Sequence, residues 1–224
     1  MSQSKIVYHR YIQQGLFVPA APKALLIGTF PSVLIKEAFG QLVPTDVNFY
    51  YGSTSNLFWR DMEKIYGQKF LYNFSQEAAE QRKGLLEKLN LAITDVIESC
   101  NTEGGVTDTS LNGVIVHEGI ISILDQHPGI TQLFFTSSSG KINAERLSLS
   151  LLNSKGRISS MNISQNSAPK IRNFIYADHQ NNRRMMQAVS LYSPSPFAKR
   201  YGVTDEKRNE QYKTYLPKMS NPDS

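Results

Sequence analysis

Short apolar runs alternate along this chain with longer segments of helical periodicity. The apolar runs predict buried strands, and they occupy residues 23–28, 91–97, 132–136 and 188–192. Apolar residues at helical spacing predict helices over residues 56–66, 76–89, 116–125 and 140–152, and a charged helix is predicted over 203–216. Residues 1–22 are polar to mixed and are predicted to end in a proline-containing loop before the first strand. Residues 153–185 are polar and basic, with weak periodicity.

Strands that alternate with helices are typical of a parallel sheet covered on both faces. We therefore predict one α/β domain over residues 1–224, built as a three-layer α/β/α sandwich around a central, mainly parallel four-stranded sheet. Ligands bind such sheets beyond the carboxyl ends of the strands. The loops that follow Ile27, Ile97, Phe135 and Tyr192 are expected to converge on one cleft.

Composition narrows the class of protein. A chain of 224 residues suits a single domain, and its longest apolar runs are too short to span a bilayer. No charged-then-apolar leader opens the chain, and Cys100 is the one cysteine, so it forms no intrachain disulfide and contributes to no cysteine metal cluster. We expect a cytoplasmic protein that binds no membrane, metal or cofactor.

Charge is distributed unevenly between the two parts of the chain. Residues 1–135 carry 10 Lys and Arg against 13 Asp and Glu, whereas residues 136–224 carry 14 against 6. A basic half suits a phosphate backbone, because each cation that meets a phosphate releases counterions. A solubilising surface is the alternative interpretation of the same excess.

The first predicted strand ends in a turn that contains a glycine, a proline and a small hydroxyl residue. Gly28, Pro31 and Ser32 would let backbone N–H groups approach a ligand closely, although an ordinary turn is an equally simple reading.

Three consecutive aromatic residues precede a polar loop and a helix start. Tyr51, beside Gly52, could present its ring to a planar base, and stacking of that kind is worth about 1–3 kcal/mol. Asn56 either bonds a substrate or caps the helix. Phe58 and Trp59 are expected to be core residues.

The last loop holds two prolines, at positions 194 and 196, and two cations. Ser195 offers a hydroxyl and a backbone donor, and Phe197 is an apolar residue followed closely by Lys199 and Arg200. An apolar residue on a stiff turn flanked by cations suits a wedge that enters a DNA minor groove. A proline-stiffened surface loop is the alternative.

Taken in order, these segments resemble the motifs of the uracil-DNA glycosylase superfamily. The segment Tyr50–Trp59 resembles the family pattern aromatic-Gly/Ala-His-Pro-x-Asn-x-Phe-Trp. The resemblance covers residues 24–200 and is closest to the deoxyinosine (hypoxanthine-DNA) glycosylase branch. The other matching segments are residues 28–32 for the first motif, 92–100 with 103–108 for the branch, and 193–196 for the closing motif.

The resemblance implies a monomeric, monofunctional DNA glycosylase of base-excision repair, with DNA as its partner. Such an enzyme hydrolyses the N-glycosidic bond of a deaminated base, uracil or hypoxanthine, flipped out of DNA. The residues that it implies are Asn56, Ser193 and Ser195 for catalysis, Phe30, Tyr51 and Asp95 for the base, Gly28, Pro31 and Ser32 for the backbone turn, and Phe197, Lys199 and Arg200 for DNA.

The chain also departs from the family pattern. Its first motif has no Asn or Asp to position water, Ser53 and Thr54 replace His-Pro, and Ser193 stands where some relatives have histidine. These departures favour an alternative, a catalytically weak or inactive relative that binds nucleic acid or a nucleobase. A small-molecule hydrolase with Ser32 or Ser195 as nucleophile is a further alternative, but the sequence contains no Gly-x-Ser-x-Gly.

Overall fold

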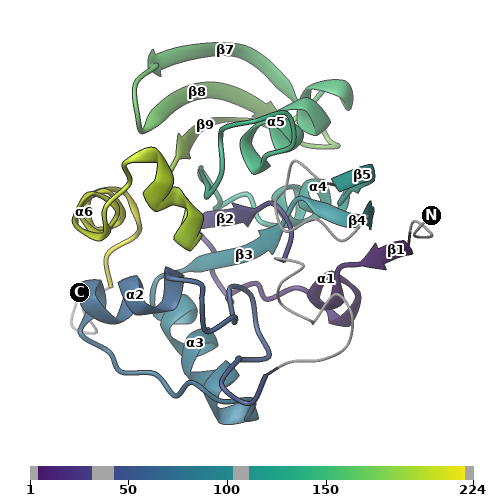
Figure 1. Cartoon of the computed structure of the whole chain (residues 1–224). Helices are drawn as coiled ribbons and strands as arrows, with labels where there is room; N and C mark the ends of the chain where they lie inside the picture. The colour runs from purple at the N-terminus through teal and green to yellow at the C-terminus, as the bar shows by residue number, and fades with distance from the viewer. Residues whose placement is uncertain (1–4, 32–42, 103–110, 220–224) are drawn as a thin grey trace.

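A computed structural model of the chain describes residues 5–31, 43–102 and 111–219 (Figure 1). The fold is mixed α/β, with a mainly parallel six-stranded sheet in the order β3-β2-β6-β9-β8-β7. Strands β3, β2, β6 and β9 run parallel, and β8 and β7 complete the sheet as antiparallel strands. The strands of this sheet are β2 (Ala24–Gly28), β3 (Leu91–Asp95), β6 (Gln132–Phe135), β7 (Ile158–Gln165), β8 (Lys170–Ala177) and β9 (Arg183–Ser190).

Five of the six α-helices in the described residues connect or follow the strands of this sheet, and several of them begin at a polar cap. Ser75 accepts a hydrogen bond from the Ala78 N–H at the start of α3, and Asn143 does the same for Arg146 at the start of α5. These helices are α2 (Phe58–Tyr66), α3 (Gln76–Lys88), α4 (Gly119–Gln126), α5 (Ala144–Ser154) and α6 (Asp205–Tyr215).

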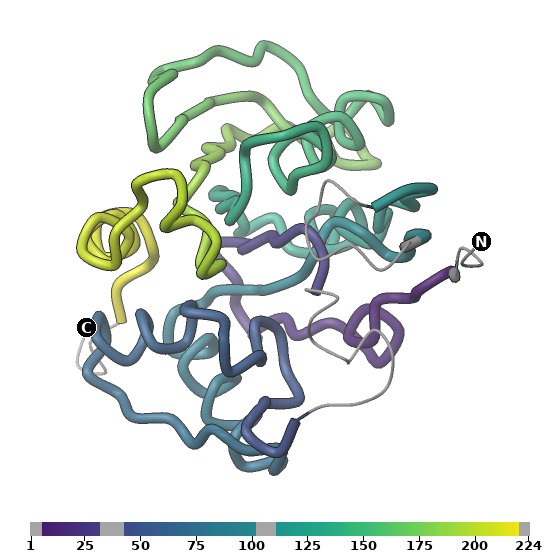
Figure 2. The backbone as a smooth tube through the Cα atoms, viewed as in Figure 1, coloured from purple at the N-terminus to yellow at the C-terminus, as the bar shows by residue number. Residues whose placement is uncertain are grey.

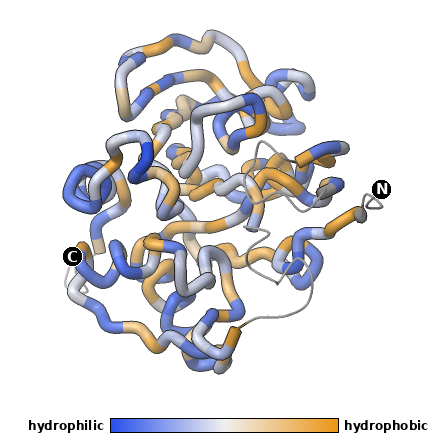
Figure 3. The backbone as a smooth tube through the Cα atoms, in the orientation of Figure 1, coloured by the Kyte–Doolittle hydropathy of each residue, from blue (hydrophilic) through white to orange (hydrophobic). Residues whose placement is uncertain are grey.

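Alternate residues of the parallel strands enter two separate hydrophobic clusters. Leu25 and Ile27 of β2 pack in a cluster that includes residues of α4 and α5. Ala24 and Leu26 pack in a second cluster with residues of α2, α3 and α6. The central strands are accordingly hydrophobic over much of their length (Figure 3). Each fully buried Leu or Ile contributes about 1.5–3 kcal/mol to this core.

A second, antiparallel sheet, which the sequence analysis missed, lies next to the end of β3. Its order is β1-β4-β5, formed by β1 (Lys5–Tyr8), β4 (Ile97–Thr102) and β5 (Leu111–Val116). The strand predicted over residues 91–97 therefore ends at Asp95, and the chain continues into β4 rather than a loop. Residues 5–22 contain β1 and α1 (Arg10–Gln14), and β1 pairs with β4. Figure 2 shows the purple segment that follows β1 passing below the central strands.

The polar segment over residues 153–185 contains the antiparallel hairpin of β7 and β8 and the start of β9. Strand β7 is exposed along nearly all its length, so it lacks the buried face that gives a strand its alternating pattern. Strand β9 begins at Arg183 rather than near residue 188: the whole strand pairs with β8, and its second half, residues 187–190, also pairs with β6. None of the helices in the described ranges is both long and apolar enough to cross a membrane.

Candidate active site

The carboxyl ends of three parallel strands meet at one edge of the sheet. Gly28 and Asp95, the last residues of β2 and β3, are register partners. Beyond them, the Val96 N–H donates to the Gly28 carbonyl at 2.9 Å, and the Thr136 N–H donates to the Ile27 carbonyl at 3.2 Å. The segments after Ile27 and Phe135 therefore leave the sheet side by side, whereas Ile97 begins strand β4 rather than a loop.

Gly28 lies where two side chains approach the backbone too closely for any other residue. A Cβ atom at this position would be 2.0 Å from Asp95 Oδ1 and 2.5 Å from the Tyr51 hydroxyl oxygen. The Tyr51 hydroxyl also hydrogen-bonds Thr136 Oγ1 at 2.9 Å. Three segments that resemble family motifs therefore meet at the Gly28 Cα atom. They are residues 28–32, residues 50–59 and residues 92–100.

Asp95 is joined to a histidine that the sequence analysis did not select. His9 Nε2 lies 2.7 Å from Asp95 Oδ2, and the two side chains are 0% and 9% exposed. His9 Nδ1 accepts a hydrogen bond from the Ile12 N–H at 3.3 Å, so the imidazole proton lies on Nε2 and is donated to Asp95. Asp95 is thus a buried carboxylate at the end of its strand.

A second histidine, His117, lies directly after β5. Its side chain is buried, and among the described residues its Nε2 atom has no hydrogen-bond partner. Burial, assisted by His9 and opposed by Asp95, lowers the pKa of His117 to about 4. His117 is therefore neutral at physiological pH; a proton on its ring would be disfavoured by His9 and favoured by Asp95.

The lowered pKa of His117 predicts an acid-sensitive fold. The unfolded imidazole takes up a proton near pH 6.5, whereas the folded one does so only near pH 4. Its contribution to stability is therefore complete above pH 6.5 and is lost as the pH falls toward 4. Between pH 7 and pH 5 we expect wild type to lose on the order of 1 kcal/mol more than His117→Gln in urea unfolding, after allowance for screening. Equal losses in both proteins would contradict this assignment.

Tyr51 has an unusual backbone conformation for a tyrosine. Its φ is 55°, in the left-handed region, which non-glycine residues adopt at a cost and often at functional sites. Its ring lies 4.6 Å from that of Phe58 at an interplanar angle of 30°. Burial, and then the nearby Asp95 carboxylate, raise the pKa of Tyr51 well above its usual value, so its hydroxyl stays protonated.

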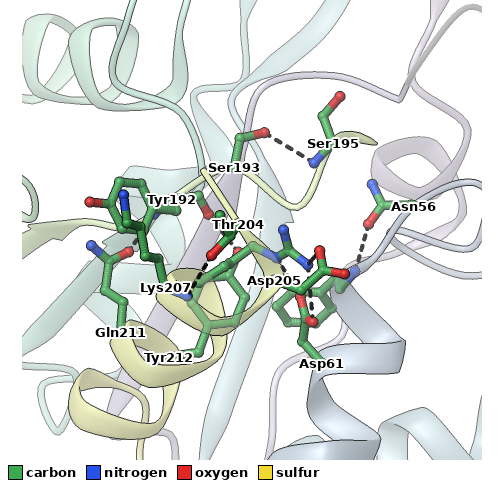
Figure 4. A network of polar contacts seen from close by, with 12 residues as sticks. Asn56, Asp61, Tyr192, Ser193, Ser195, Thr204, Asp205, Lys207, Gln211 and Tyr212 are labelled. Carbon is green, nitrogen blue, oxygen red and sulfur yellow. Dashed lines mark hydrogen bonds and ion pairs between the residues drawn. The ribbon is translucent and has the colours of Figure 1, made fainter. Parts of the chain in front are cut away.

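Asn56 and the closing motif lie on adjacent segments. The Leu57 N–H donates to the Pro194 carbonyl at 3.0 Å, which joins the second predicted motif to the last one. Asn56 Oδ1 accepts from the Phe58 N–H at 2.9 Å, so the carbonyl end of this amide caps α2 (Figure 4). Its Nδ2 group is the end that can serve a ligand.

The closing loop is held by its own hydroxyls and by α6. Ser193 Oγ accepts from the Ser195 N–H (Figure 4), and Ser195 Oγ accepts from the Phe197 N–H. The Tyr212 hydroxyl donates to the Tyr192 carbonyl at 2.7 Å. Within the described part of the chain, the hydrogen bonds of Ser195 involve no histidine, which removes support from the hydrolase alternative.

The DNA-binding residues predicted at the chain's basic end lie on a short 3-10 helix, η3 (Pro196–Tyr201). The Arg200 guanidinium lies over the half-buried Phe197 ring at 5.0 Å, and Lys199 lies 3.4 Å from Asp205. Tyr201, which the sequence analysis did not select, is 86% exposed. It is thus the aromatic side chain of η3 that projects furthest into solvent.

The remaining predicted residues divide between the site and its surroundings. Phe30 packs edge-on against His9, with ring centroids 5.5 Å apart, and Pro31 is half-buried. Ser32 and residues 103–108 lie outside the described residues. In the described ranges, no group of three or more His, Cys, Asp or Glu side chains is arranged to hold a metal ion.

Comparisons of this chain with known protein families, curated proteins and solved structures found no relative. No family model matches the chain, and neither the curated proteins nor the solved structures contain a significant match.

Proposed function

We propose that the protein is a monofunctional DNA glycosylase that hydrolyses the N-glycosidic bond of a deaminated base. The observation that carries this proposal is the meeting of Asp95 Oδ1 and the Tyr51 hydroxyl over Gly28. Three segments that resemble glycosylase motifs, far apart in sequence, contribute to one position at the carboxyl edge of a parallel sheet. Ligands of such sheets bind at this edge.

The fold supports the same proposal. Four parallel strands form the core of the larger sheet, in the order β3-β2-β6-β9, and helices contribute to a hydrophobic cluster on each side. We propose that these strands are the central sheet of a three-layer α/β/α sandwich of the uracil-DNA glycosylase type. The β7–β8 hairpin then extends that sheet at one edge.

The proposed reaction begins with extrusion of the damaged nucleotide, because its glycosidic bond is inaccessible inside a duplex. The base stacks on the half-buried ring of Tyr51, whose protonated hydroxyl is fixed by Thr136. The exposed Lys199 and Arg200 contact phosphates, and Tyr201 fills the space that the extruded base leaves. Asn56 Nδ2 bonds the substrate or the attacking water.

Asn56→Asp separates the capping role from the proposed catalytic role. Aspartate retains the oxygen that accepts the Phe58 N–H, so we expect the unfolding free energy to change by less than about 1 kcal/mol. The NH₂ donor is lost, so base excision should fall at least about 100-fold. The assay measures alkali-labile breaks in duplexes that hold one uracil, hypoxanthine or xanthine.

Each outcome of this assay has a distinct meaning. Breaks at one base by wild type, and their loss in Asn56→Asp with stability retained, support the proposal. Wild type that binds the duplexes but produces no breaks would favour the binding relative that lacks catalytic activity. Full activity in Asn56→Asp would leave Asn56 with a capping role alone.

A further inference from the structure

We infer that Asp95 is the carboxylate that orients and deprotonates the attacking water, and that His9 is its positioning residue. This inference rests on the glycosylase function proposed above. It assigns to a neighbouring strand a task that the first motif of this chain cannot perform, because residues 28–31 contain no Asn or Asp.

The position of the carboxylate supports this assignment. Asp95 ends β3 beside Gly28, the residue that begins the first motif on β2. Its Oδ1 atom lies so close to Gly28 that a Cβ there would be only 2.0 Å away. Because glycine has no side chain, position 28 leaves space for the Asp95 carboxylate. A carboxylate therefore reaches the first-motif position from the adjacent strand.

His9 fixes the orientation of this carboxylate. Its Nε2–H donates to Oδ2, which leaves Oδ1 on the side of Gly28 and the Tyr51 hydroxyl. The imidazole is held in turn by the Ile12 N–H on Nδ1. Three aromatic rings surround it with centroid distances of 5.5 to 6.0 Å, namely those of Phe30, Tyr50 and Tyr11. A hydrogen bond at each ring nitrogen prevents the imidazole from turning.

The proposed chemical step balances without a cofactor. The C1′–N bond breaks with its electron pair on the departing base, and a water oxygen bonds to C1′. The proton of that water passes to Asp95 Oδ1. Solvent returns the proton to the base nitrogen, so the products are the free base and an abasic sugar, and Asp95 is again a carboxylate.

The titratable groups that face Asp95 come from several elements. They are His9 from the segment between β1 and α1, Tyr50 and Tyr51 from the loop before α2, and His117 after β5. Burial raises the pKa of both tyrosines and lowers that of His117 to about 4, so these three groups are uncharged between pH 5 and pH 8. None of these three groups therefore changes charge beside Asp95 in that range.

The experiment measures single-turnover base excision on the duplex that wild type cleaves best. Asp95→Asn should be at least about 100-fold slower, while its affinity for a duplex with an abasic-site analogue stays within about 2-fold. Asp95→Ala should regain rate when sodium formate is added, because formate restores a carboxylate. An Asp95→Asn rate within about 3-fold of wild type, or no formate rescue in a folded Asp95→Ala, would overturn the inference.

Variants of His9 test the positioning role separately. His9→Phe keeps an aromatic ring among its three neighbours but removes the donor to Asp95, so excision should fall at least about 10-fold. His9→Gln, which keeps a donor, should recover part of the loss. His179→Phe, at a histidine whose side chain is 60% exposed, is the matched control and should match wild type. Equal rates in His9→Phe and His9→Gln would contradict positioning by a hydrogen bond.

These results distinguish the inference from the function on which it rests. If wild type releases no base from any duplex, the proposed function fails and the variants are not informative. If wild type is active and Asp95→Asn remains equally active, the function stands and the role of Asp95 is wrong.

Discussion

Gly28→Ala is expected to cut base excision at least about 100-fold and to lower the unfolding free energy by about 1–3 kcal/mol. The new methyl group would lie 2.0 Å from Asp95 Oδ1 and 2.5 Å from the Tyr51 hydroxyl oxygen. One of these side chains must move, although each is held by a hydrogen bond. Thr136 bonds the Tyr51 hydroxyl, and His9 bonds the Asp95 carboxylate. Urea unfolding and single-turnover excision measure the two effects.

Gly84→Ala is the matched control for this substitution. Gly84 lies within α3, and a Cβ there would meet no heavy atom within 4 Å. Alanine in a helix interior is favoured over glycine by about 0.5–1 kcal/mol, so this variant should be slightly more stable and fully active. A Gly28→Ala protein that behaves like Gly84→Ala would show that the close approach of Asp95 and Tyr51 is unimportant.

Asp61→Ala is expected to destabilise the protein by about 3–5 kcal/mol, because it leaves a buried guanidinium without its partner. Arg208 Nε lies 2.6 Å from Asp61 Oδ2, its Nη2 lies 3.1 Å from Oδ1, and both side chains are 1% exposed. Asp205 also bonds Arg208 Nη2, but its side chain is 33% exposed. Thermal and urea unfolding measure the loss.

Two comparisons test whether the buried charge is the cause. The double variant Asp61→Leu/Arg208→Met removes both charges and should recover most of the stability. Glu80→Ala breaks the exposed Lys83–Glu80 pair and should cost less than about 1 kcal/mol. A loss below about 1 kcal/mol in Asp61→Ala would contradict the account of this pair.

The Asp61–Arg208 pair also affects the candidate site. It joins α2, which begins beside Asn56, to α6, whose Gln211 and Tyr212 bond the backbone of Tyr192 at the start of the closing loop (Figure 4). Loss of the pair should therefore loosen the contact between the second and last motifs. We expect the decrease in stability to be accompanied by weaker activity even at temperatures where the protein remains folded.

The apolar pattern predicted the parallel core well, because a strand buried on both faces is a continuous run of apolar residues. Residues 24–28 and 132–135 form strands close to the predicted positions, and the α/β class is confirmed. The six-stranded extent of the sheet was not predicted. Strand β7 is almost wholly exposed, so its polar sequence carries no period of two.

From the sequence, only those residues of the candidate site that lie at or near a strand end could be predicted. Gly28, Asp95 and Tyr51 follow or flank strand and loop signals that the sequence displays. His9 and His117 were missed because each reaches the site through the antiparallel sheet β1-β4-β5, whose strands carry no clear pattern. The pairing of His9 with Asp95 joins residues that are 86 positions apart, and no local signal connects them.

The most direct test of the account is detection of free base by mass spectrometry after wild-type protein acts on a duplex with one uracil, hypoxanthine or xanthine. The account predicts release of one free base for each alkali-labile site, and an intact strand before alkali is added. Binding to every duplex without release of any base would contradict it.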